Sequence, residues 1–283
     1  MTRFRTPDFI CLGAQKSATT WLDGMLRANP NFFLPRIKEV HYFSQIYNDD
    51  ARLYAPRHRA SQAFDQYNYL EPSGDPKDKI TLSQLRHFAE EDVDDAWYAQ
   101  IFSSARFDQV CAEICPSYMN MPQAAVQHVL RLNPSVRLLI LVRDPVERCW
   151  SQMRMHIAQG ILAREALAAP VSTETLWPFL FYADYRGSIS RWQRFAASGQ
   201  LKIMLYDDIG ADPTGSLAQI FDFVGLPPST VDAKHVTFKG EDMEMPPNLL
   251  SHLLSVLKPQ YEFLSAIFPE AVARWLVRHN AAL

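Results

Sequence analysis

Four side chains that bind anions well follow the first apolar segment of the chain. Residues 8–13 form a short apolar run that predicts a buried strand, and a helical pattern begins at residue 18. The loop and first helical turn between them supply one ammonium group and three hydroxyl groups, those of Lys16, Ser17, Thr19 and Thr20. Backbone N–H groups and the dipole at a helix start would add to this site for a phosphate or sulfate group. An ordinary turn with a hydroxyl cap is the alternative. A Walker A loop is excluded, because the lysine comes only three residues after a single glycine.

A second candidate for anion binding lies after another apolar run. Residues 136–142 predict a central parallel strand, and Arg143 follows it directly. Since the carboxyl ends of parallel strands meet at one edge of a sheet, Arg143 is expected on the same side as Lys16. Ser151 comes eight residues later, about two turns into a helix. Arg143 and Ser151 could therefore form a second anion site, and a local pair of Arg143 with Asp144 is the alternative.

Strand and helix signals alternate around these residues. Strand-like segments are found at residues 8–13, 110–114, 136–142 and 201–206, and helical ones at 18–30, 122–132, 176–197 and 213–224, with a further helix that begins at Pro145. The alternation predicts an α/β fold, a P-loop-like core with a central, mainly parallel sheet flanked by helices on both faces. We expect one domain over residues 1–283. Residues 45–80 break the pattern and are expected to form a long irregular excursion on the substrate side.

Composition excludes several classes of protein. With 283 residues and 48% hydrophobic content, the chain can fill a large core. The 28 Lys and Arg residues against 31 Asp and Glu give a net charge of -3, so no broad basic surface is expected for nucleic acid or an anionic membrane. The four cysteines have no paired CxxC spacing, which indicates buried thiols. No signal peptide or membrane-spanning run of about 20 apolar residues is recognised, so a cytoplasmic protein is expected.

Four segments, in order along the chain, resemble motifs of the PAPS-dependent sulfotransferases. The chain is most similar to the heparan sulfate glucosaminyl 3-O-sulfotransferase branch and its bacterial relatives. Residues 9–21 resemble the 5′-phosphosulfate loop, and residues 36–43 resemble the Glu-Val-His-Phe-Phe segment. Residues 112–118 resemble the Glu-Lys-Thr-Pro-x-Tyr element, and residues 137–151 the 3′-phosphate motif. Lys239 and Gly240 match a late Lys-Gly pair, so the resemblance runs from about residue 8 to residue 240.

The resemblance implies a role for each matching residue. Lys16 would contact the bridging oxygen between the 5′-phosphate and the sulfate, and Glu39 would be the general base with His41 beside it. The residues implied for the nucleotide are Ser17, Ala18, Thr19 and Thr20 at the 5′-phosphate, Arg143 and Ser151 at the 3′-phosphate, and Lys239 and Gly240 as a closing segment. PAPS would be the co-substrate and PAP the product, with no metal required. The acceptor would be a hydroxyl, or secondarily an amine, of a carbohydrate or small molecule.

The implied chemistry is physically reasonable, and each part has an alternative. A carboxylate near the acceptor hydroxyl can take its proton, and a lysine at the departing oxygen stabilises the growing charge. From the residues alone, Glu39 would be half of a surface pair with Lys38, and His41 a half-buried histidine. Two other functions are an ATP-dependent kinase using Mg²⁺, disfavoured by the missing Walker Gly-Lys pair, and a catalytically inactive PAP- or PAPS-binding module, disfavoured because Lys16 and Glu39 are both present.

Departures from the family pattern bear on the acceptor and on the loop. Ala18 replaces a glycine, which predicts that the backbone is right-handed or extended there. Ile114 replaces a lysine and Ser44 an aspartate, and both changes disfavour a heparan-type acceptor. A group of basic residues could attract an anionic acceptor or be ordinary surface charge: Arg52, Arg57, His58 and Arg59. His156 and Arg154 could face either the site or solvent.

Overall fold

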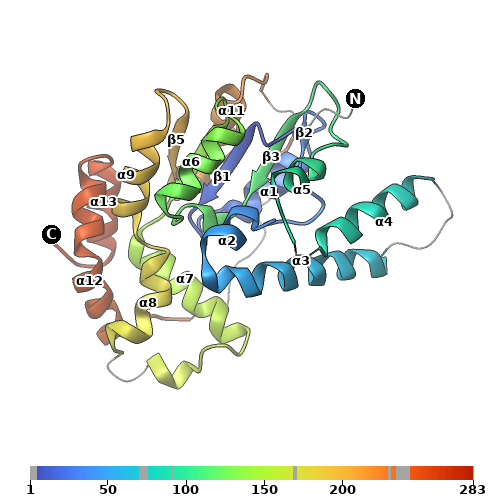
Figure 1. Ribbon diagram of the computed structural model, residues 1–283. Coiled ribbons are helices and arrows are strands. Elements are labelled where there is room, and N and C mark those ends of the chain that lie inside the picture. Colours follow the sequence, from blue (N-terminus) through green and yellow to red (C-terminus); the bar gives the residue numbers. More distant parts are fainter. Residues whose placement is uncertain are drawn as a thin grey trace.

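The sheet confirms the predicted fold class. The structure is a computed structural model that describes residues 5–69, 76–90, 92–167, 171–228, 231–233 and 243–282. Its strands are β1 (Phe9–Gly13), β2 (Phe32–Phe33), β3 (Val110–Ile114), β4 (Arg137–Val142) and β5 (Leu201–Leu205). They form a five-stranded sheet in the order β2-β3-β1-β4-β5, with every pairing parallel (Figure 1). The chain crosses from one side of β1 to the other between β3 and β4, which makes the carboxyl end of β1 a natural ligand site.

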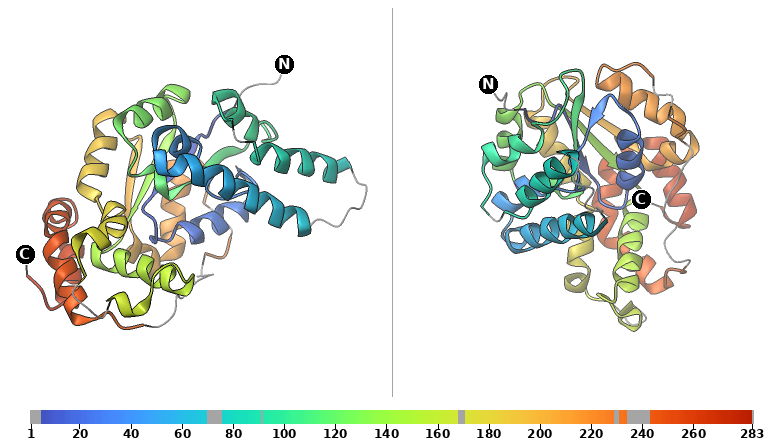
Figure 2. Two further views of the ribbon diagram at one scale, coloured as in Figure 1. Left: turned by 60° about the horizontal axis from the view of Figure 1, so that its bottom comes forward. Right: turned by 90° about the vertical axis from the view of Figure 1, so that its right-hand side faces the viewer.

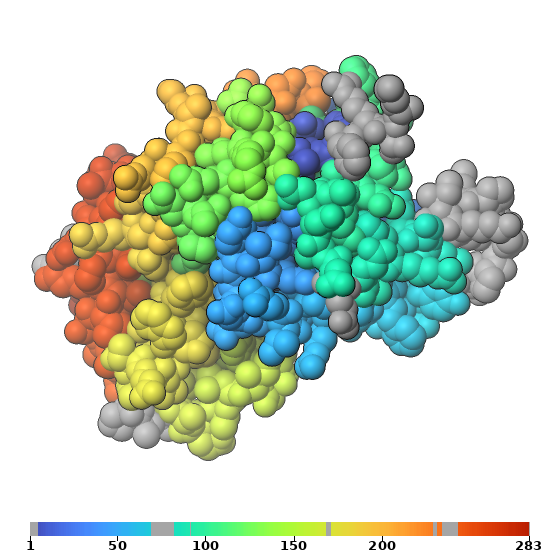
Figure 3. Space-filling view, in the orientation of Figure 1, coloured from blue at the N-terminus to red at the C-terminus, as the bar shows by residue number. Residues whose placement is uncertain are grey.

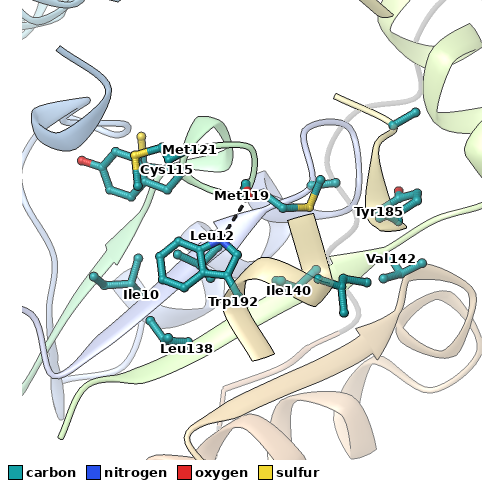
Figure 4. Close-up of a cluster of buried hydrophobic side chains, with 14 of the residues drawn as sticks. Ile10, Leu12, Cys115, Met119, Met121, Leu138, Ile140, Val142, Tyr185 and Trp192 are labelled. Carbon is teal, nitrogen blue, oxygen red and sulfur yellow. Dashed lines mark hydrogen bonds between the residues drawn. The ribbon is translucent and has the colours of Figure 1, made fainter. Parts of the chain in front are cut away.

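Two hydrophobic cores lie on opposite faces of this sheet. Alternate residues of the central strands point to opposite sides, so Ile10 and Leu138 face one core while Phe9 and Leu139 face the other. Figure 4 shows the first core, where Trp192 lies across β1 and β4 and donates a hydrogen bond from Nε1 to the Met119 carbonyl at 3.0 Å. Strands covered on both faces read as continuous apolar runs, which is why β1 and β4 are visible in the sequence.

Helices cover both faces of the sheet, as expected. The smaller core is covered by α1 (Thr19–Arg27), α10 (Tyr206–Ala211) and α11 (Pro213–Phe223). The larger core is covered by α2 (Tyr42–Tyr47), α5 (Asp95–Ile101), η1 (Pro116–Tyr118), α6 (Gln123–Leu132), α7 (Pro145–Ala158), η2 (Arg164–Leu167), α8 (Thr173–Phe181), α9 (Tyr185–Phe195), α12 (Pro247–Ser265) and α13 (Pro269–Arg278). Two more helices, α3 (Asp49–Tyr69) and α4 (Pro76–Phe88), run side by side and project from the body (Figure 2).

The prediction that residues 45–80 are irregular is wrong, because α3 and the start of α4 occupy most of this range. The side chains that α3 buries are Ala55, Arg59 and Ala63, spaced four residues apart. Two alanines and an arginine give almost no apolar periodicity, so the pattern hides the helix. The single helix expected at 176–197 is also two helices, α8 and α9. Asp184 separates them by capping α9, accepting a hydrogen bond from the Gly187 N–H at 3.0 Å.

The helix start after β4 and the state of the cysteines follow from their residue types. Asp144 caps α7, accepting a hydrogen bond from the Val146 N–H at 3.0 Å, and Pro145 is the first helical residue. All four cysteines are free and buried. Within the described residues, no helix is both long enough and apolar enough to cross a membrane.

Candidate active site

The loop after β1 turns sharply at Gly13. Its φ is 133°, and a Cβ atom at this position would lie 2.7 Å from the Pro116 carbonyl oxygen. Only glycine avoids both the unfavourable φ and the clash. The Leu12 carbonyl accepts a hydrogen bond from the Met119 N–H at 2.8 Å, and the Ala14 N–H donates to the Leu141 carbonyl at 2.9 Å. The loop is therefore tied to the carboxyl ends of both neighbouring strands before it reaches Lys16.

Two residues of this loop have left-handed backbone, Lys16 with φ 68° and Ala18 with φ 66°. The prediction that Ala18 is right-handed or extended is therefore wrong. Ala18 keeps the conformation that glycine adopts easily and bears a steric cost of about 1–2 kcal/mol. Ala18 is also the residue before α1, and no side chain caps that helix, so its first N–H groups face the loop. Ser17 between them is fully buried beside the phenol of Tyr185.

Positive side chains gather around Lys16. Burial lowers the pKa of its ammonium group, and the positive charges of Arg143, Lys38, Arg154 and Arg148 lower it further. The Lys16 Nζ atom lies 3.5 Å from the Met155 Sδ atom. A partly buried lysine surrounded by four cations repels them, and an anion placed among them would relieve that repulsion. This arrangement has the chemistry of a phosphate or sulfate site.

Arg143 and Lys16 meet, as the position of both at the carboxyl edge predicts. Arg143 donates from Nη1 to the Lys16 carbonyl at 2.9 Å, and its guanidinium lies 4.5 Å from the ring centre of Tyr206. The alternative partner Asp144 is occupied as the cap of α7; the carboxylate near Arg143 is that of Glu147, 3.6 Å from Nη2. Ser151 is half-buried on α7.

His156, on the same helix, is affected by the charge of Lys16. Burial lowers the pKa of the imidazole, and the positive charge of Lys16 adds to the effect. The side chain therefore lies toward the site and not away from it. Its ring centre is 5.2 Å from that of Phe179.

Glu39 and His41 form a second cluster. Both have left-handed backbone, with φ 62° and 57°, and their side chains converge. The Glu39 Oε2 atom lies 3.5 Å from the His41 Nε2 atom. Burial would raise the pKa of the Glu39 carboxyl, but the close contact with His41 and the positive charge of Lys38 outweigh it and lower the pKa to about 2. Glu39 is thus an ionised carboxylate at neutral pH.

The other nitrogen of His41 is held by hydroxyl groups. The Nδ1 atom lies 3.0 Å from the Ser117 Oγ atom, which in turn is 2.7 Å from the Ser44 Oγ atom. Ser44, the residue that replaces the family aspartate, is therefore part of the support of His41. This chain of hydroxyls fixes the ring and leaves Nε2 facing Glu39.

His58 of α3 completes a group that could in principle ligate a metal ion. One ligand atom each from Glu39, His41 and His58 lies within 4.8 Å of the others. Both nitrogens of His58 already have partners, since Nδ1 is 3.0 Å from the Tyr54 hydroxyl and Nε2 is 2.5 Å from the Gln62 amide nitrogen. A metal would have to displace one of these partners, so proton transfer suits the cluster better than metal binding.

Lys38 links the two clusters. Its Nζ atom donates to the Thr20 Oγ1 atom at 3.0 Å and lies 3.5 Å from the Glu39 Oε1 atom. The surface pair of Lys38 and Glu39 considered as the alternative does exist, but it spans the space between the anion loop and the carboxylate. Sequence reasoning missed this function, although its signal, a lysine directly before the glutamate, was present.

Two fully buried charges were also missed. Arg148 donates to the Phe179 carbonyl and, at 2.8 Å, to the Gln152 Oε1 atom, while its Nε and Nη1 atoms have no partner among the described residues. Glu113, at the carboxyl end of β3, accepts hydrogen bonds from the hydroxyls of Tyr98 and Tyr118. Burial raises the pKa of Glu113 to about 7. Lys239 and Gly240, predicted to close over the nucleotide, lie outside the described residues.

The chain matches a known protein family over most of its length. The family model described as the sulfotransferase family covers residues 7–230, a range that includes the four segments singled out above. Heparan sulfate glucosamine 3-O-sulfotransferase 6 of Mus musculus is 27% identical over 152 residues, which are 51% of this chain and 43% of that protein. Membrane-associated sulfotransferase kil1 of Dictyostelium discoideum is 28% identical over 151 residues, 53% of this chain and 23% of that protein. The chain thus spans less than half the length of these curated relatives.

Solved structures share the fold. A sulfotransferase from Alicyclobacillus acidocaldarius has a TM-score of 0.69 and 22% identity, with 96% of this chain and 99% of that one covered. A sulfotransferase domain from the curacin biosynthetic pathway has a TM-score of 0.54 and 15% identity, with 99% of this chain and 100% of that one covered. At such identities the likeness concerns the backbone architecture.

Proposed function

Because the chain belongs to the sulfotransferase family, we propose that it moves a sulfuryl group from PAPS to a hydroxyl group of a carbohydrate or small molecule. An amine is the second choice of acceptor. The reaction is an in-line displacement in which the acceptor loses a proton and the phosphate of PAP departs. The observation that carries the proposal is the meeting of two unlike clusters at one sheet edge, four cations around Lys16 and the ionised Glu39 beside Lys38.

The cationic cluster fits the donor. Lys16, already partly buried among positive charges, stabilises the charge that grows on the leaving phosphate oxygen without having to reorganise. Thr19 and Thr20 with the uncapped start of α1 hold the 5′-phosphate, as do Ser17 and Ala18. Arg143 and Ser151 hold the 3′-phosphate, Arg143 being fixed by its hydrogen bond to the Lys16 carbonyl.

Glu39 removes the proton of the acceptor, and His41 orients it. The pKa of about 2 makes Glu39 a weak base on its own, because Lys38 and His41 stabilise its charge. Lys38 also reaches Thr20 of the donor loop, so an anion bound there competes with Glu39 for the ammonium group. Losing that stabilisation raises the pKa of Glu39 and makes it a better base when the donor is in place.

The acceptor end of the site disfavours a polyanion. Glu39 raises the pKa values of two tyrosines, Tyr54 on α3 and Tyr182 after α8, for which burial is the larger cause. Phenols and the imidazole of His58 thus surround the base, and of the predicted basic group Arg59 is buried in the protein. Uncharged rings suit a neutral sugar or aromatic acceptor better than a heparan-like chain.

Thermal unfolding with PAP, ADP and ATP·Mg²⁺ at equal concentrations tests the donor. A ligand that binds only the native state at a hundredfold excess over its Kd stabilises it by about 2.7 kcal/mol. We expect a clear rise in Tm with PAP that Arg143→Ala abolishes. If ATP·Mg²⁺ raises the Tm and PAP does not, the result would instead support the kinase. PAP binding without any sulfated product from a panel of neutral and anionic acceptors would support the inactive binding module.

A further inference from the structure

One face of α3 is bonded to the backbone that leads into the Glu39 turn. Three side chains on this face, at positions i, i+3 and i+7, make the contacts: Arg59, Gln62 and Gln66. Gln66 donates to the Arg36 carbonyl at 2.6 Å, and Arg59 donates from Nη1 to the Val40 carbonyl at 3.2 Å. Gln62 bonds Lys38 twice, donating to its carbonyl at 3.0 Å and accepting from its N–H at 3.3 Å. The helix therefore holds every second residue of the segment 36–40.

These contacts matter because the turn they support is costly. The left-handed backbone of Glu39 and His41 is sterically unfavourable for residues with a Cβ atom, so the turn persists only where its surroundings impose it. Val40, between the two, is fully buried and cannot move without disrupting the core. Four hydrogen bonds from α3 end on this segment, and together they oppose the steric cost of the turn.

Two buried ionisable side chains, Arg59 and Glu113, hold Val40. Arg59 is fully buried and donates to two further carbonyls, those of Phe88 and Glu90, each at 3.1 Å. Its guanidinium also lies 4.8 Å from the ring centre of Trp97. The N–H of Val40 is directed at the buried Glu113 carboxylate. The peptide groups on both sides of Val40 are thus fixed by buried side chains, a guanidinium on one side and a carboxyl group on the other.

We propose that Arg59 and Gln62 of α3 are positioning residues for the general base, which they hold by bonding the backbone of Val40 and Lys38. The inference rests on the proposed function of Glu39. It assigns the inner face of α3 to the catalytic turn, although the region was expected to serve the substrate. The exposed side of the same helix remains available to the acceptor: in Figure 3 the surface of α2 and the first turns of α3 lies beside that of α8.

Single substitutions along α3 give a graded test. We expect Arg59→Met to lower kcat by about ten- to hundredfold, the scale expected when a catalytic group moves by about 1 Å. Gln62→Ala should lower kcat less, and Gln66→Ala, which acts farthest from Glu39, should lower it least. Arg59→Lys should recover part of the loss because it can still donate to the Val40 carbonyl. Arg194→Met, an exposed change on α9, is the matched control and should leave kcat unchanged.

A positioning role differs from a general structural role in its effect on correctly folded protein. The number of folded molecules is measured as the number of PAP-binding sites. kcat is expressed per PAP-binding site from calorimetric titration, and the Kd for PAP is expected to stay within twofold of wild type, because the donor loop is untouched. A kcat within twofold of wild type for both Arg59→Met and Gln62→Ala would overturn the proposal. So would a loss of PAP binding that matches the loss of kcat. If Arg59→Met does not fold, Gln62→Ala and Arg59→Lys carry the test.

A readout without turnover separates this inference from the proposed function. Ring resonances of His41 report the geometry of the turn in NMR spectra, and those of His252 on α12 serve as the internal reference. We expect Gln62→Ala to shift the His41 signals and leave the His252 signals in place. Unshifted His41 signals would count against positioning. Full turnover in Glu39→Gln would instead remove the proposed base, even where the His41 signals move.

Discussion

Two turns of this protein share one backbone pattern and carry opposite chemistry. In each, two left-handed non-glycine residues flank a fully buried one: Lys16 and Ala18 flank Ser17, and Glu39 and His41 flank Val40. The buried residue anchors the turn in the protein. The first turn lies among cations, whereas the second combines a carboxylate, an imidazole and hydroxyl groups.

The difference in charge suits the two turns to different tasks. Excess positive charge binds an anion and stabilises a charged leaving group, but it would hinder a base. A cluster of mixed charge can exchange a proton without a large change in net charge. We call residues 16–18 the donor turn and residues 39–41 the acceptor turn, after their proposed roles. Lys38 contacts both turns, so experiments can separate them only with variants that keep this residue.

The largest effect is expected from Glu39→Gln, which breaks the acceptor turn alone. An amide keeps the shape but cannot take the proton, so turnover should fall by about 10²–10⁴-fold while the Kd for PAP stays close to wild type. Formation of sulfated product and calorimetry measure the two quantities. Glu262→Gln, the same change on the exposed side of α12, is the control and should be silent. Equal losses of turnover and PAP binding would show that the turns are not separable.

Arg143→Ala should break the donor turn alone. Removing a charge-assisted contact to the 3′-phosphate weakens PAP binding by about 1.5–3 kcal/mol, or roughly ten- to hundredfold. Calorimetric titration with PAP measures this directly. Arg137 at the other end of β4 provides a matched control, since Arg137→Ala is made at the opposite edge of the sheet. Similar losses in both variants would argue against a nucleotide site beyond the carboxyl ends.

The pH dependence of stability sharpens the contrast between two carboxylates of the acceptor side. Burial raises the pKa of Glu113 to about 7 from the ordinary value of 4.5, so the folded state binds more protons than the unfolded state between these values. Its contribution to the free energy of unfolding is therefore fully present below about pH 4.5 and is lost as pH rises to about 7. Glu39, with a pKa of about 2, acts in the opposite sense, and its contribution is lost below pH 4.5.

Denaturant titrations of wild type and Glu113→Gln between pH 4.5 and 7 measure this effect. We expect wild type to lose unfolding free energy relative to Glu113→Gln as pH rises from 4.5 to 7, because the amide does not titrate. The exposed change Glu262→Gln again serves as the reference. A pH-independent difference would place the pKa of Glu113 outside the window.

The smallest effect concerns the backbone of the donor turn. Ala18→Gly removes the steric cost of a φ of 66° and should raise the free energy of unfolding by about 1 kcal/mol, or roughly 2–4 °C in Tm. Ala28, at the other end of α1, has a φ of -73°, so Ala28→Gly gains nothing there and should destabilise slightly. If both variants raise, or both lower, the free energy of unfolding, backbone strain is not what distinguishes the two positions.

The sequence predicts the sheet because buried parallel strands leave continuous apolar runs, as at residues 136–142. It also predicts which residues meet at the carboxyl edge, since Lys16 and Arg143 each follow such a strand. The helix α3 escapes detection because its buried face is made of alanines and Arg59, with polar side chains bonded to backbone. Hydrophobic periodicity reveals a helix that buries apolar side chains on one face. A helix whose polar side chains bond to the backbone of another segment shows no such periodicity.

Backbone conformation is the other limit of prediction. Glycine marks the turn at Gly13, but Lys16, Ala18, Glu39 and His41 adopt left-handed geometry without any residue type that favours it. Tertiary contacts impose these conformations, and the contacts come from segments far away in sequence. Lys38 illustrates the same point, because its role depends on Thr20 lying 3.0 Å away. Only the folded chain brings that pair together.

The hydrogen bonds from α3 to residues 36, 38 and 40 have a consequence for how this enzyme can diverge. They end on main-chain oxygen and nitrogen atoms, which every residue type presents alike. Mutations that change side chains of the held segment leave its path intact, and mutations on the outer side of α3 leave the held segment alone. The fold thereby separates the backbone path of the Glu39 turn from changes in the surface around it, so that surface can vary while the turn keeps its geometry.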